Sequence, residues 1–320
     1  MTVMSVTGTV KAEDLGLTLV HEHIVVAMGE LNPAEAPDRR EILAMAVDRL
    51  QELKDHGVST FVDPCPMELG RDPELYAEVS QRSGINIIFA TGFYYEGAGL
   101  PVDWRGREAQ EIADLYVKEL TEGVDGTGLR PGVIKAATGM EVTALERQCL
   151  AAAGQAQKRC GAAIITHTEH SRHGEIQQDI FAQNGADLAR VLIGHQDEQT
   201  TAEPIRKLAQ RGTFVGMDRI GLEMLSSDER RADHIAELVR SGFVRQVCLS
   251  QDCVCAMIFT RWPFPGPKPT NPLKAWAERN KPYTHILTHF VPLLLERGVS
   301  DADIDTMLRD NPRRLLTGKA

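Results

Sequence analysis

Two histidines separated by a single glutamate interrupt the apolar segment 17-LTLVHEHIVV-26. On a β-strand alternate side chains share a face, so His21 and His23 are expected to point to one side and Glu22 outward, toward the helices. Imidazole is the commonest metal ligand in proteins. The pair is therefore a candidate part of a metal site, although a lone H-x-H is also compatible with ordinary buried histidines.

Other apolar segments also end in, or carry, residues that bind metals, move protons or hold anions. These residues are Lys135, His167, His195, Arg219 and Asp252. Three of them have a simpler interpretation: His167 and His195 as buried histidines satisfied by the backbone, and Asp252 as an aspartate that caps a helix. Two further histidines, His170 and His173, follow in a polar stretch and are expected to be exposed. The set as a whole is a stronger signal for a metal centre than any member.

The lysine is the hardest of these residues to explain by packing. Lys135 lies between Val133, Ile134 and Ala136, where a bare ammonium is costly to bury. It must either pair with an acid or lose its proton and become a neutral, nucleophilic amine. A neutral amine reacts with carbon dioxide to give a carbamate, whose two oxygens can bridge two cations.

A repeating pattern of short apolar and longer helix-periodic segments must position these residues. Eight segments are typical of strands: 17–23, 59–64, 86–92, 132–139, 163–170, 190–197, 213–221 and 246–252. Helices are predicted at 40–57, 109–123, 142–161, 228–242, 283–299 and 301–316. This alternation predicts an α/β fold, a single (β/α)8 TIM barrel over residues 1–320. Its active site is expected where the C-terminal ends of the strands converge.

One stretch stands outside this pattern and is rich in proline and aromatic residues. It is predicted to be a long loop at about 253–282, over the mouth of the barrel. Its aromatic side chains, together with Trp104, either line an apolar pocket or hold the loop in place. We favour the pocket for Trp262 and Phe264, and leave Trp276 undecided.

Composition narrows the function classes further. The 320 residues carry a formal net charge of -10, which argues against nucleic acid as a partner. The sequence contains no apolar run long enough for a membrane span, and its start lacks the pattern of a signal peptide. Six scattered cysteines suit a reducing compartment. We therefore expect a cytoplasmic protein whose partner is a small molecule.

Several motifs together resemble the phosphotriesterase family of the amidohydrolase superfamily, in its lactonase-like branch. The matching segments are 16-GLTLVHEHI-24, 132-GVIKAA-137, 164-IITHT-168, 192-LIGHQD-197, 215-VGMDRIGLE-223, 248-CLSQD-252 and 308-LRDNPRRLL-316. They extend over essentially the whole chain. The resemblance also implies a homodimer.

The resemblance implies two divalent metal ions. Zinc is the first choice, and cobalt, manganese and iron are alternatives. One is held by His21, His23 and Asp252, the second by His167 and His195, and N6-carboxylysine at Lys135 bridges them together with a hydroxide. That hydroxide attacks the substrate, and Asp252 accepts its proton.

The substrate expected from this resemblance is a lactone or carboxyl ester, with promiscuous activity on organophosphate triesters. Tyr94 and Arg219 match the lactonase-like branch, and Glu198 stands where both branches carry an aspartate, which leaves its role open. Alternatives are a dedicated aryldialkylphosphatase and an amidase for N-acylated small acids. A mononuclear deaminase is disfavoured by Lys135, and a non-catalytic binding protein by the intact ligand set.

Overall fold

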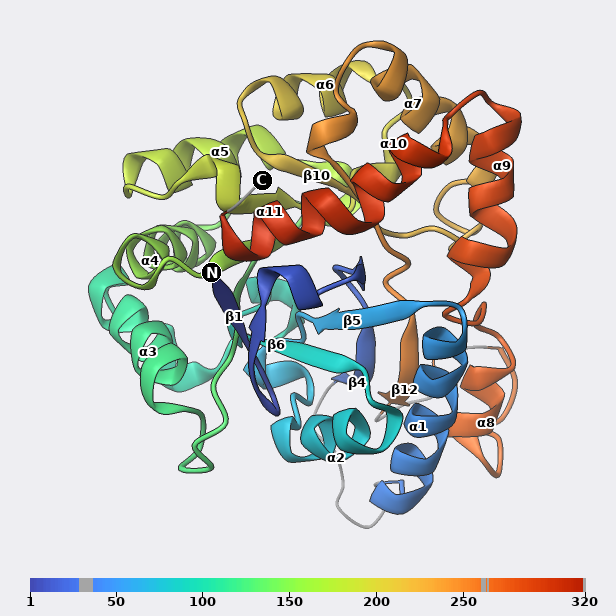
Figure 1. Cartoon of the computed structure of the whole chain (residues 1–320). Helices are drawn as coiled ribbons and strands as arrows, with labels where there is room; N and C mark the ends of the chain where they lie inside the picture. Colours follow the sequence, from blue (N-terminus) through green and yellow to red (C-terminus); the bar gives the residue numbers. More distant parts are fainter. Residues whose placement is uncertain (29–36, 260–262, 264, 319–320) are drawn as a thin grey trace.

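Eight parallel strands pair in consecutive order around a nearly closed barrel (Figure 1). The computed structural model describes residues 1–28, 37–259, 263 and 265–318. The barrel strands are β3 (Leu17–Leu19), β5 (Val58–Asp63), β6 (Asn86–Gly92), β7 (Val133–Thr138), β8 (Ala163–Thr168), β9 (Val191–Ile193), β10 (Phe214–Met217) and β11 (Val247–Leu249). The predicted fold class and all eight predicted strands are confirmed.

Helices cover the outside of this sheet (Figure 1). They are α1 (Arg39–Asp55), α2 (Pro73–Ser83), α3 (Ala109–Glu122), α4 (Ala144–Cys160), α5 (Gly174–Gln183), α6 (Glu203–Gln210) and α7 (Asp228–Arg240). Residues at the helix ends mark where the helices begin and stop. For example, α4 begins with a reciprocal capping box of Thr143 and Glu146 and ends at Gly161, which has a left-handed backbone. Sequence analysis predicted α1, α3, α4 and α7 but missed α2, α5 and α6, which are shorter. Among the helices of the described residues, none has the length and apolarity needed to cross a bilayer.

The C-terminal helical region is less regular than predicted. It consists of α9 (Val291–Glu296), α10 (Asp301–Asp305) and α11 (Asn311–Thr317), with π-helical turns at Ile286–Phe290 and Thr306–Asp310. Each π-helical turn ends just before a proline-containing turn, with Pro292 and Pro312 at the second position. Proline lacks an N–H and clashes with the carbonyl four residues earlier, so a wider turn accommodates it.

The seam between the first and eighth strands differs from the sequence-based expectation. Both chains continue past the barrel as β4 (His23–Met28) and β12 (Val254–Phe259), which pair in parallel with Val254 opposite His23. A further helix, α8 (Pro272–Ala277), follows. The prediction of a loop throughout about 253–282 was therefore wrong. The mostly buried side chains of β4 and β12 explain why these segments pair.

Alternating side chains divide the strands between two cores. Ile165, Leu192 and Phe214 point into the barrel, and Ile164 and Ile193 point to the layer under the helices. The β-hairpin of β1 (Thr2–Ser5) and β2 (Gly8–Lys11) contributes to the inner core at the N-terminal end. This end is therefore filled, and the open end lies at the strand C-termini.

Gly92→Ala is expected to destabilise the barrel by about 3–5 kcal/mol. Gly92 has φ +120°, and a Cβ there would lie 2.0 Å from the carbonyl oxygen of Lys135 on the neighbouring strand. The matched control is Gly99→Ala, at φ +107° with no atom within 4 Å of the added Cβ. Its free energy of unfolding is expected to fall by only about 1–3 kcal/mol, because of backbone strain. Urea unfolding measures both, and equal losses would contradict the role of the close approach.

Candidate metal centre

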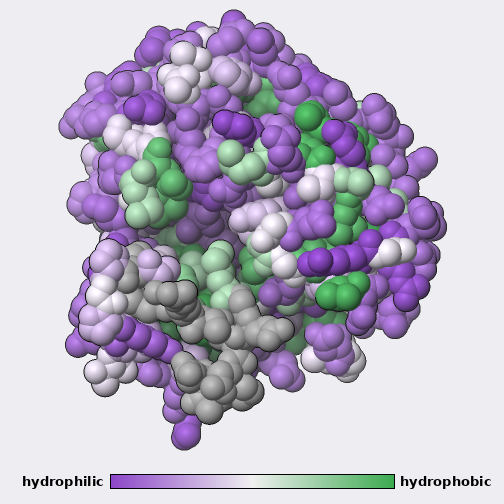
Figure 2. Space-filling view, turned by 180° about the vertical axis from the view of Figure 1, so that it is seen from behind, coloured by the Kyte–Doolittle hydropathy of each residue, from purple (hydrophilic) through white to green (hydrophobic). Residues whose placement is uncertain are grey.

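The six residues singled out as metal ligands meet in one pocket at the C-terminal ends of the strands, although they come from five separate segments. The pocket has a volume of about 250 Å³ and is lined by His21, His23, Tyr94, Lys135, His167, His195, Arg219 and Asp252. It lies on the side of the molecule opposite the N-terminal hairpin, and Figure 2 shows that face hollowed near its middle.

The Asp252 carboxylate lies at the centre of the cluster. Its Oδ1 is 3.2 Å from His23 Nε2 and 3.8 Å from His21 Nε2, and its Oδ2 is 3.8 Å from His195 Nε2. The Nζ atom of Lys135 lies 3.2 Å from His21 Nε2. Three imidazoles, a carboxylate and an amine thus direct their polar atoms at one small volume.

Each of these three imidazoles has its other nitrogen held by a carboxylate. Nδ1 of His21 and Nδ1 of His195 lie 3.0 and 2.9 Å from the two oxygens of Asp218. Nδ1 of His23 lies 3.0 Å from Asp63 Oδ1. A carboxylate on the outer nitrogen fixes the ring and leaves the inner nitrogen free to bind a metal, which is the usual arrangement around metal-ligating histidines.

The fourth histidine is oriented the other way round. The Nε2 atom of His167 lies 2.9 Å from Glu169 Oε2, and its Nδ1 lies 3.1 Å from the Tyr94 hydroxyl. The rings of His167 and His195 are 4.6 Å apart. With Nε2 held by Glu169, Nδ1 is the nitrogen that His167 can offer to a ligand.

Sequence analysis did not identify the three carboxylates that hold these rings. Asp63 ends a predicted strand, Asp218 lies in the next-to-last one, and Glu169 follows His167 by two residues. A charged residue at the end of an apolar strand was the available signal. Asp218 fits inside the barrel because Gly216 has no side chain: a Cβ there would lie 2.4 Å from Asp218 Oδ2.

Burial and neighbouring charges favour neutral imidazoles at His21, His167 and His195 and an ionised carboxylate at Asp252. Burial lowers the pKa of His21 and His195, and lowers that of His167 to about 4. Burial alone would raise the pKa of Asp252, but the neighbouring His195 and His23 outweigh it and hold the pKa well below its usual range. For His23, burial is outweighed by Asp252 and Asp63, which raise its pKa.

Lys135 is almost completely buried, as its apolar neighbours in the sequence predicted. Burial lowers the pKa of its ammonium to about 8, against the opposing effect of Asp252 and Asp218. An appreciable fraction of the side chain is then a neutral amine near neutral pH. This is the form that carbamate formation requires.

Arg219 connects the cluster to a surface network. Its Nε donates to Asp252 Oδ2 at 3.1 Å, and its guanidinium donates to Glu198 Oε1 at 2.7 Å. The other oxygen of Glu198 lies 2.8 Å from His170 Nδ1. His170 is about half exposed, as expected, and its ring is held by Glu198.

The expected orientation of one side chain needs correction. Glu22 does not point outward toward the helices: it is fully buried and accepts hydrogen bonds from Ser250, Gln251 and Cys253 at the seam. A three-residue strand ends before Glu22, so the strand alternation assumed for it does not apply. No pairing joins β3 to β11 among the described residues, and this carboxyl group adds side-chain hydrogen bonds to the few backbone ones that connect the two segments.

The aromatic residues near the loop differ in their roles. Trp276 lines the pocket, and its indole donates to the Val254 carbonyl at 2.9 Å. Trp104 packs against Phe93 with ring centroids 5.9 Å apart. The predicted pocket residues Trp262 and Phe264 lie outside the described residues. The rest of the wall is largely apolar and includes Val26, Leu69, Leu222, Met224, Val254 and Met257.

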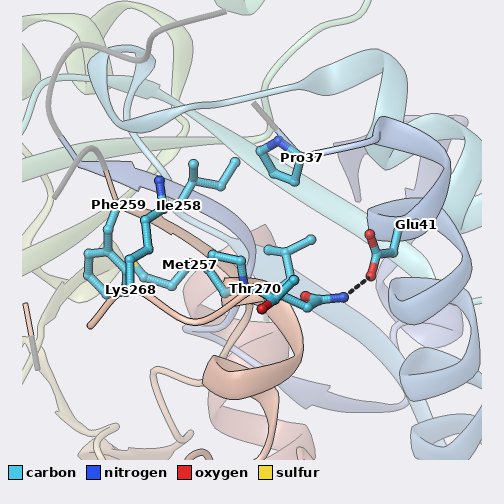
Figure 3. A pocket seen from close by; sticks show the side chains of 10 residues that line it. Pro37, Glu41, Met257, Ile258, Phe259, Lys268 and Thr270 are labelled. Atoms are coloured by element: carbon cyan, nitrogen blue, oxygen red, sulfur yellow. Dashed lines mark hydrogen bonds between the residues drawn. The ribbon is translucent and has the colours of Figure 1, made fainter. Parts of the chain in front are cut away.

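A second cavity of about 240 Å³ lies between the start of α1, β12 and the start of α8 (Figure 3). Its lining includes Glu41, Met257, Ile258 and Lys268, and Asn271 donates to Glu41 across it at 2.8 Å. Met257 lines both cavities. This cavity contains none of the predicted site residues, so we place the chemistry in the histidine-lined pocket.

The barrel and its convergent imidazoles, amine and carboxylates define a hydrolase with a candidate metal centre at the strand C-termini. Its family is clear from the sequence as well. The chain belongs to the phosphotriesterase family, whose model matches residues 1–316. The resemblance recognised from the motifs is thereby confirmed.

Individual relatives cover the chain almost completely. A phosphotriesterase homology protein of Mycobacterium tuberculosis is 36% identical over 97% of this chain and 95% of its own length. An aryldialkylphosphatase of Saccharolobus solfataricus is 31% identical over 97% of each chain. A solved structure of a mutant PTE-like lactonase from Deinococcus radiodurans superposes with a TM-score of 0.87 at 33% identity, over 98% of this chain and all of that one.

Proposed function

We propose that this hydrolase uses a binuclear metal centre to open lactones or cleave carboxyl esters, with promiscuous activity on organophosphate triesters. The observation that carries the proposal is the position of the Tyr94 hydroxyl, 3.1 Å from His167 at the mouth of the histidine cluster. In the same pocket Arg219 donates a hydrogen bond to the Asp252 carboxylate, and the rest of the pocket wall is largely apolar. The PTE-like lactonase from Deinococcus radiodurans is a structural neighbour consistent with it.

The donor set fits two divalent cations. His21, His23 and Asp252 would hold one, and His167 and His195 the other, with carbamylated Lys135 between them. Two observations support the assignment. Each ring has one nitrogen beside a carboxylate and directs the other into the cluster, and the pKa of three of the imidazoles is lowered. Nitrogen and carboxylate ligands suit zinc, and also cobalt, manganese or iron.

The protein residues have separable tasks in this mechanism. Bound divalent cations supply Lewis acidity and lower the pKa of a shared water. Asp252, kept ionised by its neighbours, accepts the proton released from that water and returns it to the leaving group. Arg219 holds Asp252 in place through its Nε, and Tyr94 hydrogen-bonds the lactone oxygen. The apolar wall binds the acyl group and excludes bulk water.

An amidase for N-acylated small acids is less well supported by the pocket. Such a substrate carries an anionic group that needs a cationic partner. Among the described residues that line the pocket, the lysine and arginine are Lys135, which is buried, and Arg219, which already contacts Asp252 and Glu198. A lactone or ester with an apolar substituent leaves no such charge unpaired.

A substrate panel tests the proposal. Matched lactones, aryl esters, acyl amides and a nitrophenyl triester are compared at known metal content. We expect kcat/KM to be highest for a lactone or ester and lower for the triester. A preference for the amide would favour the amidase, and a preference for the triester would favour a dedicated aryldialkylphosphatase. Full activity with fewer than two metal equivalents would contradict the binuclear centre.

Tyr94→Phe is expected to reduce kcat on the lactone by about 10–100-fold, because it removes a hydrogen bond made to the reacting oxygen. The ring and its packing stay in place, so KM and stability should change little. The control is Tyr95→Phe, since Tyr95 stacks on the same His167 ring at 5.6 Å. Steady-state kinetics on both variants are the measurement, and equal losses would contradict a specific role of the Tyr94 hydroxyl.

The expected homodimer, cytoplasmic location and single-domain organisation remain predictions. Sedimentation velocity on the purified protein measures the first directly.

A further inference from the structure

Glu22 lies between two proposed metal ligands, yet its side chain turns away from them into the seam of the barrel. The side chain is fully buried. Its Oε1 accepts hydrogen bonds from the Ser250 hydroxyl at 2.8 Å and from the Gln251 amide at 2.7 Å. Its Oε2 accepts from the Cys253 amide at 2.9 Å. The three hydrogen bonds to its two oxygens hold this buried carboxyl group in position.

The two amides bound by Glu22 flank Asp252 on either side. Asp252 itself has a left-handed backbone, with φ +52°, and its own amide donates to the His21 carbonyl at 3.0 Å. A non-glycine residue in this conformation is strained and persists only where its surroundings enforce it. Hydrogen bonds to the preceding and following amides are a direct means of enforcing it.

The same contacts join the two ends of the sheet. The Ser250 hydroxyl also accepts from the His21 amide at 3.0 Å, and the His23 amide donates to the Cys253 carbonyl at 2.8 Å. The segments that carry His21, His23 and Asp252 are therefore fixed to each other through Glu22 and its partners, close to the Asp252 contact with His23.

We propose that Glu22 is a positioning residue that holds Asp252 in its left-handed conformation, so that one metal binds between His21, His23 and Asp252. The inference rests on the proposed binuclear function and extends it to a residue outside the ligand set. Glu22 touches neither a metal nor the substrate in this arrangement. Its effect passes through the backbone of Gln251 and Cys253.

The test compares Glu22→Gln with Glu146→Gln in the full-length protein. Glu146 is a matched control because it is also buried and also accepts from backbone amides, those of Glu96, Gly139 and Thr143. Each variant is stripped of metal and titrated with zinc, and metal content is determined after dialysis. Cobalt(II) absorption spectra report the ligand geometry independently of activity.

Glu22→Gln is expected to bind one of its two metals about 10–100-fold more weakly, as for other residues that orient metal ligands. It should also show an altered cobalt spectrum. Glu146→Gln should match the wild type in both measurements even where its melting temperature falls. Wild-type affinity and spectrum in Glu22→Gln would overturn the inference.

If Glu22→Gln does not fold, the variant Ser250→Ala provides the test. Metal binding at least about threefold weaker than in the wild type supports the inference, and unchanged binding overturns it. A wild type that binds fewer than two metals would instead refute the proposed function.

Discussion

Lys135→Ala is expected to lose metal and activity together, with kcat/KM reduced by about 10³-fold or more. In the proposed mechanism the bridging carbamate can then no longer form, and several kcal/mol of transition-state charge stabilisation would depend on the centre it holds together. Metal analysis after dialysis and steady-state kinetics on the preferred lactone are the measurements. Between the metal-free proteins stability should not fall in parallel, because the wild-type side chain is there a buried amine whose removal relieves desolvation.

Chemical rescue separates the bridging role from a merely structural one. Lys135→Ala leaves space for a small carboxylate such as acetate or propionate, which can take the place of the carbamate. Lys135→Met removes the amine but fills that space, so it serves as the matched control. We expect added carboxylate to restore metal binding and part of the activity in Lys135→Ala only. A Lys135→Ala enzyme with two metals and near-normal kcat/KM would refute the bridge.

The residues that sequence analysis grouped lie together in the structure for a geometric reason. Side chains at the ends of parallel barrel strands converge, so His21, His167, His195 and Asp252 could be grouped before their distances were known. Lys135 added a separate physical argument, because an ammonium within a strand of apolar residues needs an explanation. Both arguments depend on strand order and burial, and the apolar periodicity of the sequence indicates both.

What the sequence did not reveal depends on contacts between segments. Asp218 holds two histidines at once, through both of its oxygens, and no spacing in the sequence indicates such a shared partner. Glu22 was placed on the wrong side because the alternation rule was extended past the end of a strand of three residues. The pairing of β4 with β12 was missed because a run rich in proline and aromatic residues follows it.

Contacts of the same kind hold the four histidine rings in defined orientations. Each of the four histidines has one nitrogen beside a carboxylate, and the protein holds these carboxylates by backbone amides as well: Asp63 accepts from Ile24 and Cys65, and Asp218 from His195. Rings fixed in this way need little reorganisation when a cation enters.

Asp252→Asn is expected to lower kcat by about 10³-fold or more, with a smaller change in KM. Asparagine keeps the shape of the side chain and one acceptor oxygen, but it cannot take up a proton at neutral pH and neutralises no cation. Metal content should fall toward one equivalent, because His21 and His23 lose their anionic partner. Kinetics and metal analysis on the same preparation test both parts.

Glu198→Gln is the matched control for this change, since Glu198 is the other carboxylate that contacts Arg219. It leaves the contact of Arg219 Nε with Asp252 intact, so kcat should fall by no more than about tenfold, the size of one lost charge-assisted hydrogen bond at the margin of the site. If both variants lose activity equally while keeping two metals, the orientation of Arg219 matters and proton transfer by Asp252 does not. If only Asp252→Asn loses its activity, and it also releases metal, the result supports the Asp252 carboxylate as both metal ligand and base.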